Sequence, residues 1–284
     1  MEKISASIVV YKTEPQLLLR AMDSFRKGSL SGKLSIIDNS PTDELKKFCP
    51  EDVQYIFNGK NLGYGRAHNI ALRESLDQSL YHLVLNPDVC FDIDVIEKLF
   101  HFMESQPQAG LVMPKVYSDD GSVQMLCKLL PTPLNLAARR FNPFERLLKK
   151  LNDRYEMKES GYDSVMNVPF LSGCFMFLRT AALKHVGLFD ERFFLYAEDT
   201  DLSRRIHESF QTLFYPDASI THIHARGSYK SFDLTLQNLK SAFQYFNKWG
   251  WLFDAERVQI NQRALSQVYE SEVQTKALTE AAAA

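Results

Sequence analysis

Hydrophobic and polar positions alternate in short blocks through the first hundred residues. Residues 4–11 (Ile-Ser-Ala-Ser-Ile-Val-Val-Tyr) are nearly all apolar or small, which is typical of a strand buried on both faces. Similar runs at 33–37, 53–57 and 81–85 predict three further strands. Segments with helical spacing or helix-start residues alternate with them, at 14–28, 43–48, 64–76 and 93–105.

This alternation predicts an α/β fold built on a doubly wound, mostly parallel sheet, because short connections favour right-handed βαβ units. The second half is less regular. We expect a strand pair at 111–117 and 122–127 around the turn 119–121, and strands at 174–178, 212–215 and 219–222. Helices are expected at 181–186, 199–208 and 233–249, with a last amphipathic segment at 255–269.

Composition narrows the class of protein. The chain is 45% hydrophobic and 24% charged with a net charge of -2, which is ordinary for a globular protein and gives no sign of nucleic-acid binding. No apolar run approaches the ~18 residues of a membrane span, and 4–11 is too short for a signal peptide. The cysteines lack zinc-site spacing, so we expect free thiols in a reducing cytoplasm.

Polar residues cluster just after the expected strand ends, where open α/β sheets bind ligands: Thr13, Asp38, Asn61 and Asp88. Asp88 belongs to Asn86-Pro87-Asp88, and a carboxylate there can hold Mg²⁺ or Mn²⁺ together with substrate phosphates. The same tripeptide is also common turn chemistry. Gly63 and Gly65 lead into a helix N-terminus that either favours an anion or is an ordinary helix cap.

Three later segments carry candidate chemistry. Glu198-Asp199-Thr200-Asp201 follows the aromatic run 193–196, so Asp199 is either a general base or an acid favoured by the helix dipole. His222-Ile-His224 supplies either metal ligands or structural histidines. Residues 131–154 interleave apolar with basic side chains, which indicates either a segment on an anionic membrane surface or a solvated helix.

Taken in order, these motifs resemble the family 2 glycosyltransferases of GT-A fold. The resemblance covers roughly residues 4–230. It rests on seven runs: Ser7-Ile-Val-Val-Tyr, Ile37-Asp-Asn-Ser, Asn61-x-Gly-x-Gly, Asn86-Pro-Asp, Ser172-Gly-Cys, Gly187-Leu-Phe-Asp-Glu and Glu198-Asp-Thr-Asp-Leu. The resemblance implies a Rossmann-like sheet with a smaller mixed acceptor-side region and C-terminal helices.

The resemblance also implies roles for single residues. Asp199 matches the catalytic base, and Glu198 and Asp201 support its position. Asp88 matches the last acid of the family's Asp-x-Asp motif, whose first acid is here Asn86. Metal, Mg²⁺ or Mn²⁺, would be held by Asp88 with His222 or His224, and spacing leaves the choice between the two histidines open. The nucleotide-sugar site would comprise Val10, Tyr11, Thr13, Asp38, Asn61, Gly63, Asn69, Asn86 and Asp88. The acceptor side would comprise Ser172, Gly173, Tyr196 and Glu198.

The Asn-Pro-Asp variant and the 189–199 run resemble bacterial rhamnosyltransferases of surface-polysaccharide synthesis, such as O-antigen in lipopolysaccharide. This implies an inverting transfer of L-rhamnose from dTDP-L-rhamnose to a lipid-linked glycan. It also implies peripheral contact with the cytoplasmic face of the inner membrane, and an oligomer is possible. Alternatives are a transferase using another nucleotide-sugar, a non-catalytic nucleotide-sugar binder, and a sugar nucleotidyltransferase. The last is disfavoured because residues 12–15 form no glycine-rich phosphate loop.

These expectations divide the chain. A catalytic domain would span residues 1–230, with a nucleotide-sugar-binding half at 1–118 and an acceptor half at 119–230 that contains the basic amphipathic insertion 131–154. A helical region would follow at 231–272, and a disordered tail at 273–284.

Overall fold

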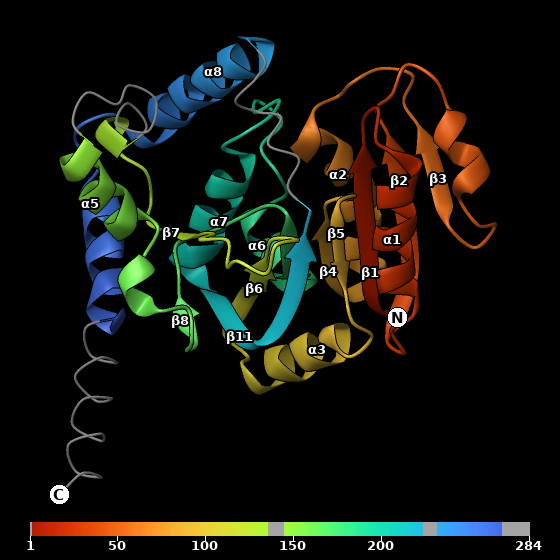
Figure 1. The fold of residues 1–284 in the computed structure, drawn as a ribbon, viewed down its shortest axis with the longest axis horizontal. Coiled ribbons are helices and arrows are strands. Elements are labelled where there is room, and N and C mark those ends of the chain that lie inside the picture. The colour runs from red at the N-terminus through yellow and green to blue at the C-terminus, as the bar shows by residue number, and fades with distance from the viewer. Residues whose placement is uncertain (1, 136–144, 224–231, 269–284) are drawn as a thin grey trace, which may run out of the picture.

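The computed structural model describes residues 2–135, 145–223 and 232–268. Its first four strands and the helices between them lie where the hydrophobic pattern predicts (Figure 1). The strands are β1 (Glu2–Val10), β2 (Ser31–Asp38), β3 (Gln54–Phe57) and β4 (Ser79–Leu85). The helices are α1 (Pro15–Arg26), the 3-10 turn η1 (Glu44–Phe48), α2 (Tyr64–Gln78) and α3 (Val95–Ser105).

One sheet of nine strands organises the molecule, in the order β3-β2-β1-β4-β10-β6-β11-β5, with β8 also paired to β11. Six of the nine run in one direction, because only β10, β5 and β8 are antiparallel to their neighbours. The prediction of a mostly parallel sheet is confirmed. The later strands are β5 (Val89–Phe91), β6 (Ala109–Tyr117), β8 (Met166–Asn167), β10 (Phe175–Arg179) and β11 (Gln211–His222).

The alternation of side chains along β1 explains the layers. Ile4, Ala6 and Ile8 point to the face covered by α1 and join the main core. Val9 points to the opposite face and packs with Ala67 of α2. Both faces are therefore covered, which is why β1 has no charged side chain after Lys3.

Two serines on the α2 face of β1 begin a buried chain of hydrogen bonds. Ser5 Oγ lies 2.8 Å from His82 Nδ1, and His82 Nε2 lies 2.8 Å from Ser7 Oγ. Ser7 Oγ in turn lies 2.8 Å from Nδ1 of His68 on α2. Burial lowers the pKa of His82 to about 3, so this ring is neutral in the folded protein at neutral pH.

The expected strand at 122–127 is wrong. It is reduced to a single bridge between Val123 and Tyr117, while β10 pairs with Leu111 and Val112 of β6 and β11 pairs along the other edge of β6. The chain instead continues into β7 (Cys127–Lys128), which pairs with β9 (Phe170–Leu171). The two short strands expected at 212–215 and 219–222 form one strand, β11, whose register shift absorbs the residues between Tyr215 and Ser219.

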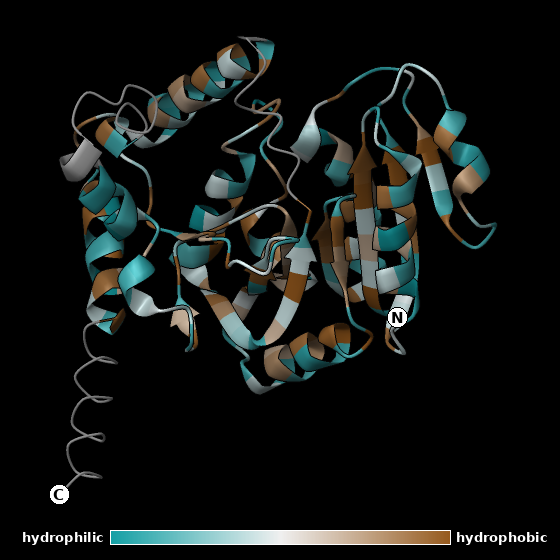
Figure 2. Cartoon of the chain, viewed as in Figure 1, coloured by the Kyte–Doolittle hydropathy of each residue, from teal (hydrophilic) through white to brown (hydrophobic). Residues whose placement is uncertain are grey.

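Helices complete the second half. They are α5 (Glu145–Tyr155), the 3-10 turn η2 (Lys158–Ser160), α6 (Thr180–Val186), α7 (Glu198–Ser209) and α8 (Phe232–Trp249), and residues 255–268 are also helical. Figure 2 shows polar and apolar residues interspersed along α8. No helix among the described residues is both long and apolar enough to span a bilayer. The cysteines are free, as expected: Cys49, Cys90, Cys127 and Cys174.

The two halves expected at 1–118 and 119–230 share this sheet. β10 lies between β4 and β6, and β11 pairs with both β6 and β5. The expected helical region 231–272 contains α8 and residues 255–268, whereas the expected tail 273–284 lies outside the described residues.

Candidate active site

The carboxyl ends of β1, β2 and β3 lie level along one edge of the sheet. Val10 is in register with Asp38, and Asp38 with Phe57. The Val10 side chain lies in the core, while its carbonyl accepts a 2.9 Å hydrogen bond from the Asn39 amide. The residues expected to hold a nucleotide therefore start from a common edge, although Val10 presents no side chain there.

The turn after β1 is built on an unusual backbone. Lys12 has a φ of 51°, in the left-handed region, and its amide donates to Ser40 Oγ at 2.9 Å. The Tyr11 amide donates to Thr13 Oγ1 at 3.2 Å. The Tyr11 ring is exposed, so it is the expected nucleotide-site residue most open to stacking with a planar base.

Asp38 is fully buried, and both carboxylate oxygens bind within the protein. The Ser40 amide donates to Oδ1 at 2.7 Å, and the Tyr55 hydroxyl donates to Oδ2. Burial, then the bond to Asp38, raises the pKa of the Tyr55 phenol. A base or ribose could therefore contact Asp38 directly only if it shared the carboxylate with the Tyr55 hydroxyl or the Ser40 amide.

An asparagine-rich turn precedes α2. Asn61 Oδ1 accepts the Gly63 amide at 2.9 Å, and Asn39 Nδ2 donates to the Gly63 carbonyl at 3.1 Å. Gly63 has a φ of 87°, and a Cβ there would lie 2.3 Å from the Phe194 carbonyl oxygen. Only glycine fits at this point. Asn61 and Gly63 thus shape the loop and bring it against the aromatic run 193–196.

Asn69 has a different place from the one expected. Its Nδ2 donates to the Phe189 carbonyl at 2.9 Å and to Glu191 at 3.2 Å, and its Oδ1 accepts the Phe189 amide at 3.1 Å. These bonds use both the amide nitrogen and the amide oxygen of Asn69. The side chain therefore holds the 187–191 loop against α2 and has no group left to bind a nucleotide-sugar.

Tyr64 joins the two sides of the site. Its hydroxyl lies 2.9 Å from Asn86 Oδ1 and 2.7 Å from the Gly173 carbonyl, and burial raises its pKa well above the usual value. The Asn86 amide also donates to the Cys174 carbonyl at 2.9 Å. Asn86 therefore lies within the protein framework that positions the next acid, Asp88.

Asp88 and His222 face each other across β5 and β11. His222 Nε2 lies 3.3 Å from Asp88 Oδ1, a buried oxygen that accepts no hydrogen bond from the described residues. Gln124 fixes the histidine: His222 Nδ1 donates to Gln124 Oε1 at 3.0 Å, and Gln124 Nε2 donates to the His222 carbonyl at 2.9 Å. These contacts orient the ring so that Nε2 faces the carboxylate.

The Asp88 oxygen and the His222 nitrogen are directed at the same point, so this pair fits a divalent metal with nitrogen and oxygen ligands. No group of three or more acidic, histidine or cysteine side chains suited to a metal occurs in the described part of the chain. A metal would therefore take its remaining ligands from phosphate oxygens and water. His224 lies outside the described residues, so only His222 is placed at the pair.

Asp199 lies in the first turn of α7, opposite the Gly173 turn. Its Oδ2 accepts the Gly173 amide at 2.9 Å, and its Oδ1 accepts the Thr200 amide at 2.8 Å. A Cβ on Gly173 would lie 3.1 Å from Asp199 Cβ, so glycine permits this approach. Tyr196 and Ala197, directly before α7, have φ values of 70° and 66°. This strained left-handed backbone directs the N-terminus of α7 toward the Gly173 turn.

The two adjacent acids have different surroundings. Burial, followed by repulsion from Asp199, raises the pKa of Glu198 well above its usual value, and its Oε2 has no hydrogen-bond partner among the described residues. Burial also raises the pKa of Asp199, but the Gly173 amide opposes this shift. Glu198 is therefore the acid of the pair whose environment more strongly favours the protonated form, whereas the Gly173 amide and the helix N-terminus favour a carboxylate at Asp199.

A cavity of about 800 Å³ opens in front of Asp199. Ser172, Tyr196, Glu198 and His222 also line it, as do residues of α8. The structure thus brings the expected acceptor-side residues together with Asp199 and His222. The nucleotide-site residues Tyr11, Thr13, Asp38 and Asn61 do not line this cavity and lie at the other strand ends.

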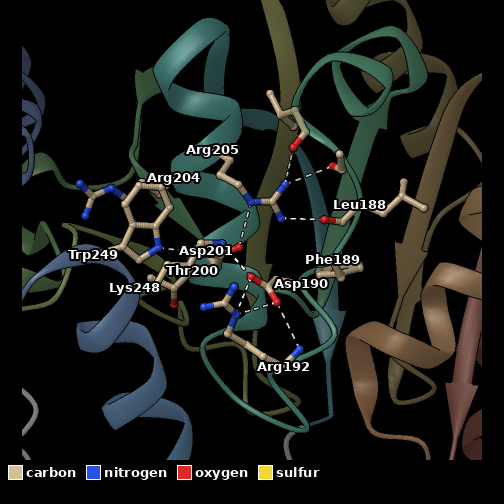
Figure 3. A network of polar contacts seen from close by, with 12 residues as sticks. Leu188, Phe189, Asp190, Arg192, Thr200, Asp201, Arg204, Arg205, Lys248 and Trp249 are labelled. Atoms are coloured by element: carbon tan, nitrogen blue, oxygen red, sulfur yellow. Dashed lines mark hydrogen bonds and ion pairs between the residues drawn. The ribbon is translucent and has the colours of Figure 1, made fainter.

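The back of α7 is tied down by an ionic network (Figure 3). Asp201 is fully buried and binds Arg205 at 2.9 Å, Trp249 Nε1 at 2.8 Å and Lys248 at 2.7 Å. Lys248 also binds Asp190 at 2.8 Å. Asp201 therefore supports the position of the α7 N-terminus, the role expected for it.

Sequence reasoning missed Tyr64, Gln124 and Lys128. Tyr64 lies inside the Asn61-x-Gly-x-Gly run, so an aromatic residue within a glycine loop could have indicated a site residue. Gln124 is 98 residues from His222 and no spacing rule links them. Lys128 lines the cavity and lies 5.3 Å from the Phe170 ring, and its positive charge helps hold down the pKa of Asp199.

Residues 5–187 match the family described as "Glycosyl transferase family 2". The match includes the turns after β1, β2 and β4 and the Gly173 turn that contacts Asp199. This chain belongs to the family 2 glycosyltransferases.

Curated relatives give narrower names. The chain is 27% identical over 207 residues to the N-acetylglucosaminyl-diphospho-decaprenol L-rhamnosyltransferase of Mycobacterium tuberculosis, covering 66% of this chain and 65% of that one. It is 24% identical over 253 residues to rhamnosyltransferase WbbL of Escherichia coli, covering 84% and 90%. It is 26% identical over 208 residues to the low-salt glycan biosynthesis hexosyltransferase Agl10 of Haloferax volcanii, covering 72% and 62%.

A solved structure of GalNAc-T7 with UDP, GalNAc and Mn²⁺ is similar in fold, with a TM-score of 0.57 and 14% identity over 78% of this chain and 44% of that one. The GT-A fold expected for this glycosyltransferase is confirmed. The chain spans less than two thirds of the mycobacterial and haloarchaeal relatives.

Proposed function

We propose that this glycosyltransferase transfers L-rhamnose from dTDP-L-rhamnose, with inversion, to a hydroxyl of a lipid-linked glycan in bacterial surface-polysaccharide synthesis. Two relatives are named rhamnosyltransferases, and the name of one includes a diphospho-decaprenol. The proposed place of work is the cytoplasmic face of the inner membrane. The observation that carries the reaction type is the position of Asp199, whose carboxyl group accepts the Gly173 amide at the cavity wall.

The chemistry follows from this placement. Asp199 would take the proton of an acceptor hydroxyl as that oxygen attacks the anomeric carbon and the nucleotide diphosphate leaves. Mg²⁺ or Mn²⁺, when held by Asp88 and His222, would offset the charge on the diphosphate. Gln124 would hold His222 with Nε2 toward the metal, and Tyr11 would stack on the base. A protonated Glu198 would donate a hydrogen bond to the acceptor.

The name of one relative supports a second candidate function. The Haloferax protein is named a hexosyltransferase, so transfer of another hexose from its nucleotide-sugar is the alternative. A panel of nucleotide-sugars measured by thermal shift with Mn²⁺ separates the two, because a bound donor raises the melting temperature. The largest shift with dTDP-L-rhamnose is expected, and a larger shift with another donor would refute rhamnose.

Two isosteric amides test the base. Asp199→Asn keeps the shape and the Gly173 contact but removes the basic oxygen, so transfer should fall about 10²–10⁴-fold while dTDP binding is nearly unchanged. Glu198→Gln is the matched control, because it makes the same acid-to-amide change at the adjacent residue, and it should keep most activity. Transfer is followed by mass spectrometry and binding by calorimetry. If the Asp199→Asn enzyme keeps most of its activity, Asp199 is not the general base.

A further inference from the structure

Exposed apolar side chains recur along α8 and in the residues that follow it, and the Phe243 and Trp251 rings are in contact. Thirteen large apolar side chains are exposed among the residues that the structure describes, and seven of them fall between 236 and 258. Scattered exposed apolar residues are ordinary, but a gathered set marks an interaction surface. We call these seven the C-terminal apolar patch: Leu236, Leu239, Phe243, Trp251, Leu252, Phe253 and Val258.

The tip of this patch is rigidly presented. Phe253 is 96% and Leu252 77% exposed. Buried Arg257 donates to the carbonyls of Gly250 at 3.3 Å and Trp251 at 3.1 Å.

Asp254, directly after the tip, binds buried Arg204 at 2.7 Å, and a φ of 99° at Gly250 makes the turn before it. Hydrogen bonds and an ion pair therefore hold the backbone on both sides of the tip. The fold itself thus keeps the Leu252 and Phe253 side chains in solvent.

The patch adjoins the candidate active site. Leu234, Asn238, Ala242 and Tyr245 of α8 line the cavity in front of Asp199. Leu236, Leu239 and Phe243, on the remaining surface of the same helix, belong to the patch. An acceptor with an apolar tail would thus find polar groups in the cavity and apolar surface beside it.

We propose that the C-terminal apolar patch docks into the acyl-chain region of a lipid bilayer, which brings a membrane-borne acceptor to the cavity; the acceptor part rests on the proposed function. An aromatic, convex tip suits a fluid interface, where Trp and Phe side chains concentrate. Exposed Lys240 on α8, and Lys149 and Lys150 on α5 at the same end of the molecule (Figure 1), suit lipid phosphates.

Tryptophan fluorescence reports on this surface directly, because the only two tryptophans are Trp249 and Trp251. With vesicles of equal parts phosphatidylcholine and phosphatidylglycerol, we expect a blue shift, and quenching when the acyl chains are brominated. Leu252→Ser/Phe253→Ser should lower the partition coefficient roughly tenfold or more, from the apolar area withdrawn. Leu80→Ser/Ile93→Ser is the control, because it also changes two exposed apolar residues (43% and 61% exposed) but lies outside the patch, and it should partition as wild type.

The outcomes are distinct. Absence of quenching, or equal partition of both double variants, overturns the proposal. A dimer in size-exclusion chromatography that Phe253→Ser dissociates, without vesicle binding, assigns the patch to a second copy and also overturns it. Transfer to a water-soluble acceptor should be the same in wild type and Leu252→Ser/Phe253→Ser. If wild type shows quenching but transfers no sugar, the proposed function fails while the membrane surface stands.

Discussion

Acid should destabilise this protein through His82, and the size of the effect follows from its burial. The unfolded chain binds a proton at a histidine below pH 6.5, whereas folded His82 binds one only near pH 3. Its stabilising contribution is therefore complete above pH 6.5 and is lost as pH falls toward 3. The full difference amounts to about 5 kcal/mol, and about 2 kcal/mol of it is lost between pH 7.5 and 5.0.

A pair of variants isolates this contribution, since other groups titrate in the same window. Burial also lowers the pKa of His207 to about 4 and that of His68 well below 6.5. His82→Gln keeps a side chain that can hydrogen-bond between Ser5 and Ser7 but cannot be protonated. His101→Gln, on the exposed surface of α3, controls for the loss of one histidine.

Urea unfolding at several pH values between 7.5 and 5.0, followed by circular dichroism, gives the free energy of unfolding for each variant. His82→Gln should be less stable than wild type at pH 7.5, and that gap should narrow by about 2 kcal/mol at pH 5.0. Parallel pH profiles for wild type and His82→Gln would refute the assignment of a buried neutral imidazole, and so would the same narrowing in His101→Gln.

Two further predictions concern the site. Gly173→Ala would place a Cβ 3.1 Å from Asp199 Cβ and displace the base, so kcat should fall about tenfold or more while dTDP affinity, measured by calorimetry, stays within about twofold. Asp88→Ala removes one of the two expected metal ligands, so the gain in dTDP affinity on adding Mn²⁺ should largely disappear. An unchanged Mn²⁺ effect would place the metal elsewhere.

The first half of the fold could be predicted because its strands are buried on both faces and its helices have clear periodicity. The short strands β5, β7, β8 and β9 could not, since two or three residues carry no period. The failed strand at 122–127 has a global cause. The strands that pair with the two edges of β6, β10 and β11, come later in the chain, so the sequence around 122–127 cannot reveal them.

The candidate site was predictable where chemistry is local. Asp88 and Asp199 stand in short motifs, and the structure places each next to its expected surroundings. The use of Asn69 as a loop anchor was not predictable, because an amide suits a ligand and a main-chain partner equally well. The contact between Gln124 and His222 was not predictable either. The two residues are far apart in sequence, and only the pairing of β11 with β6 and β5 brings them together.

The position of β10 has a consequence for synthesis on the ribosome. β4 and β6 are successive long strands, yet they are not neighbours, because β10 fills the gap between them. A nascent chain that has emerged only to residue 170 therefore leaves one edge of β4 and both edges of β6 open, and these are templates for aggregation until β10 and β11 arrive. Fragments that end near residue 118 keep that gap permanently, so the first half of this enzyme is a poor unit for separate expression.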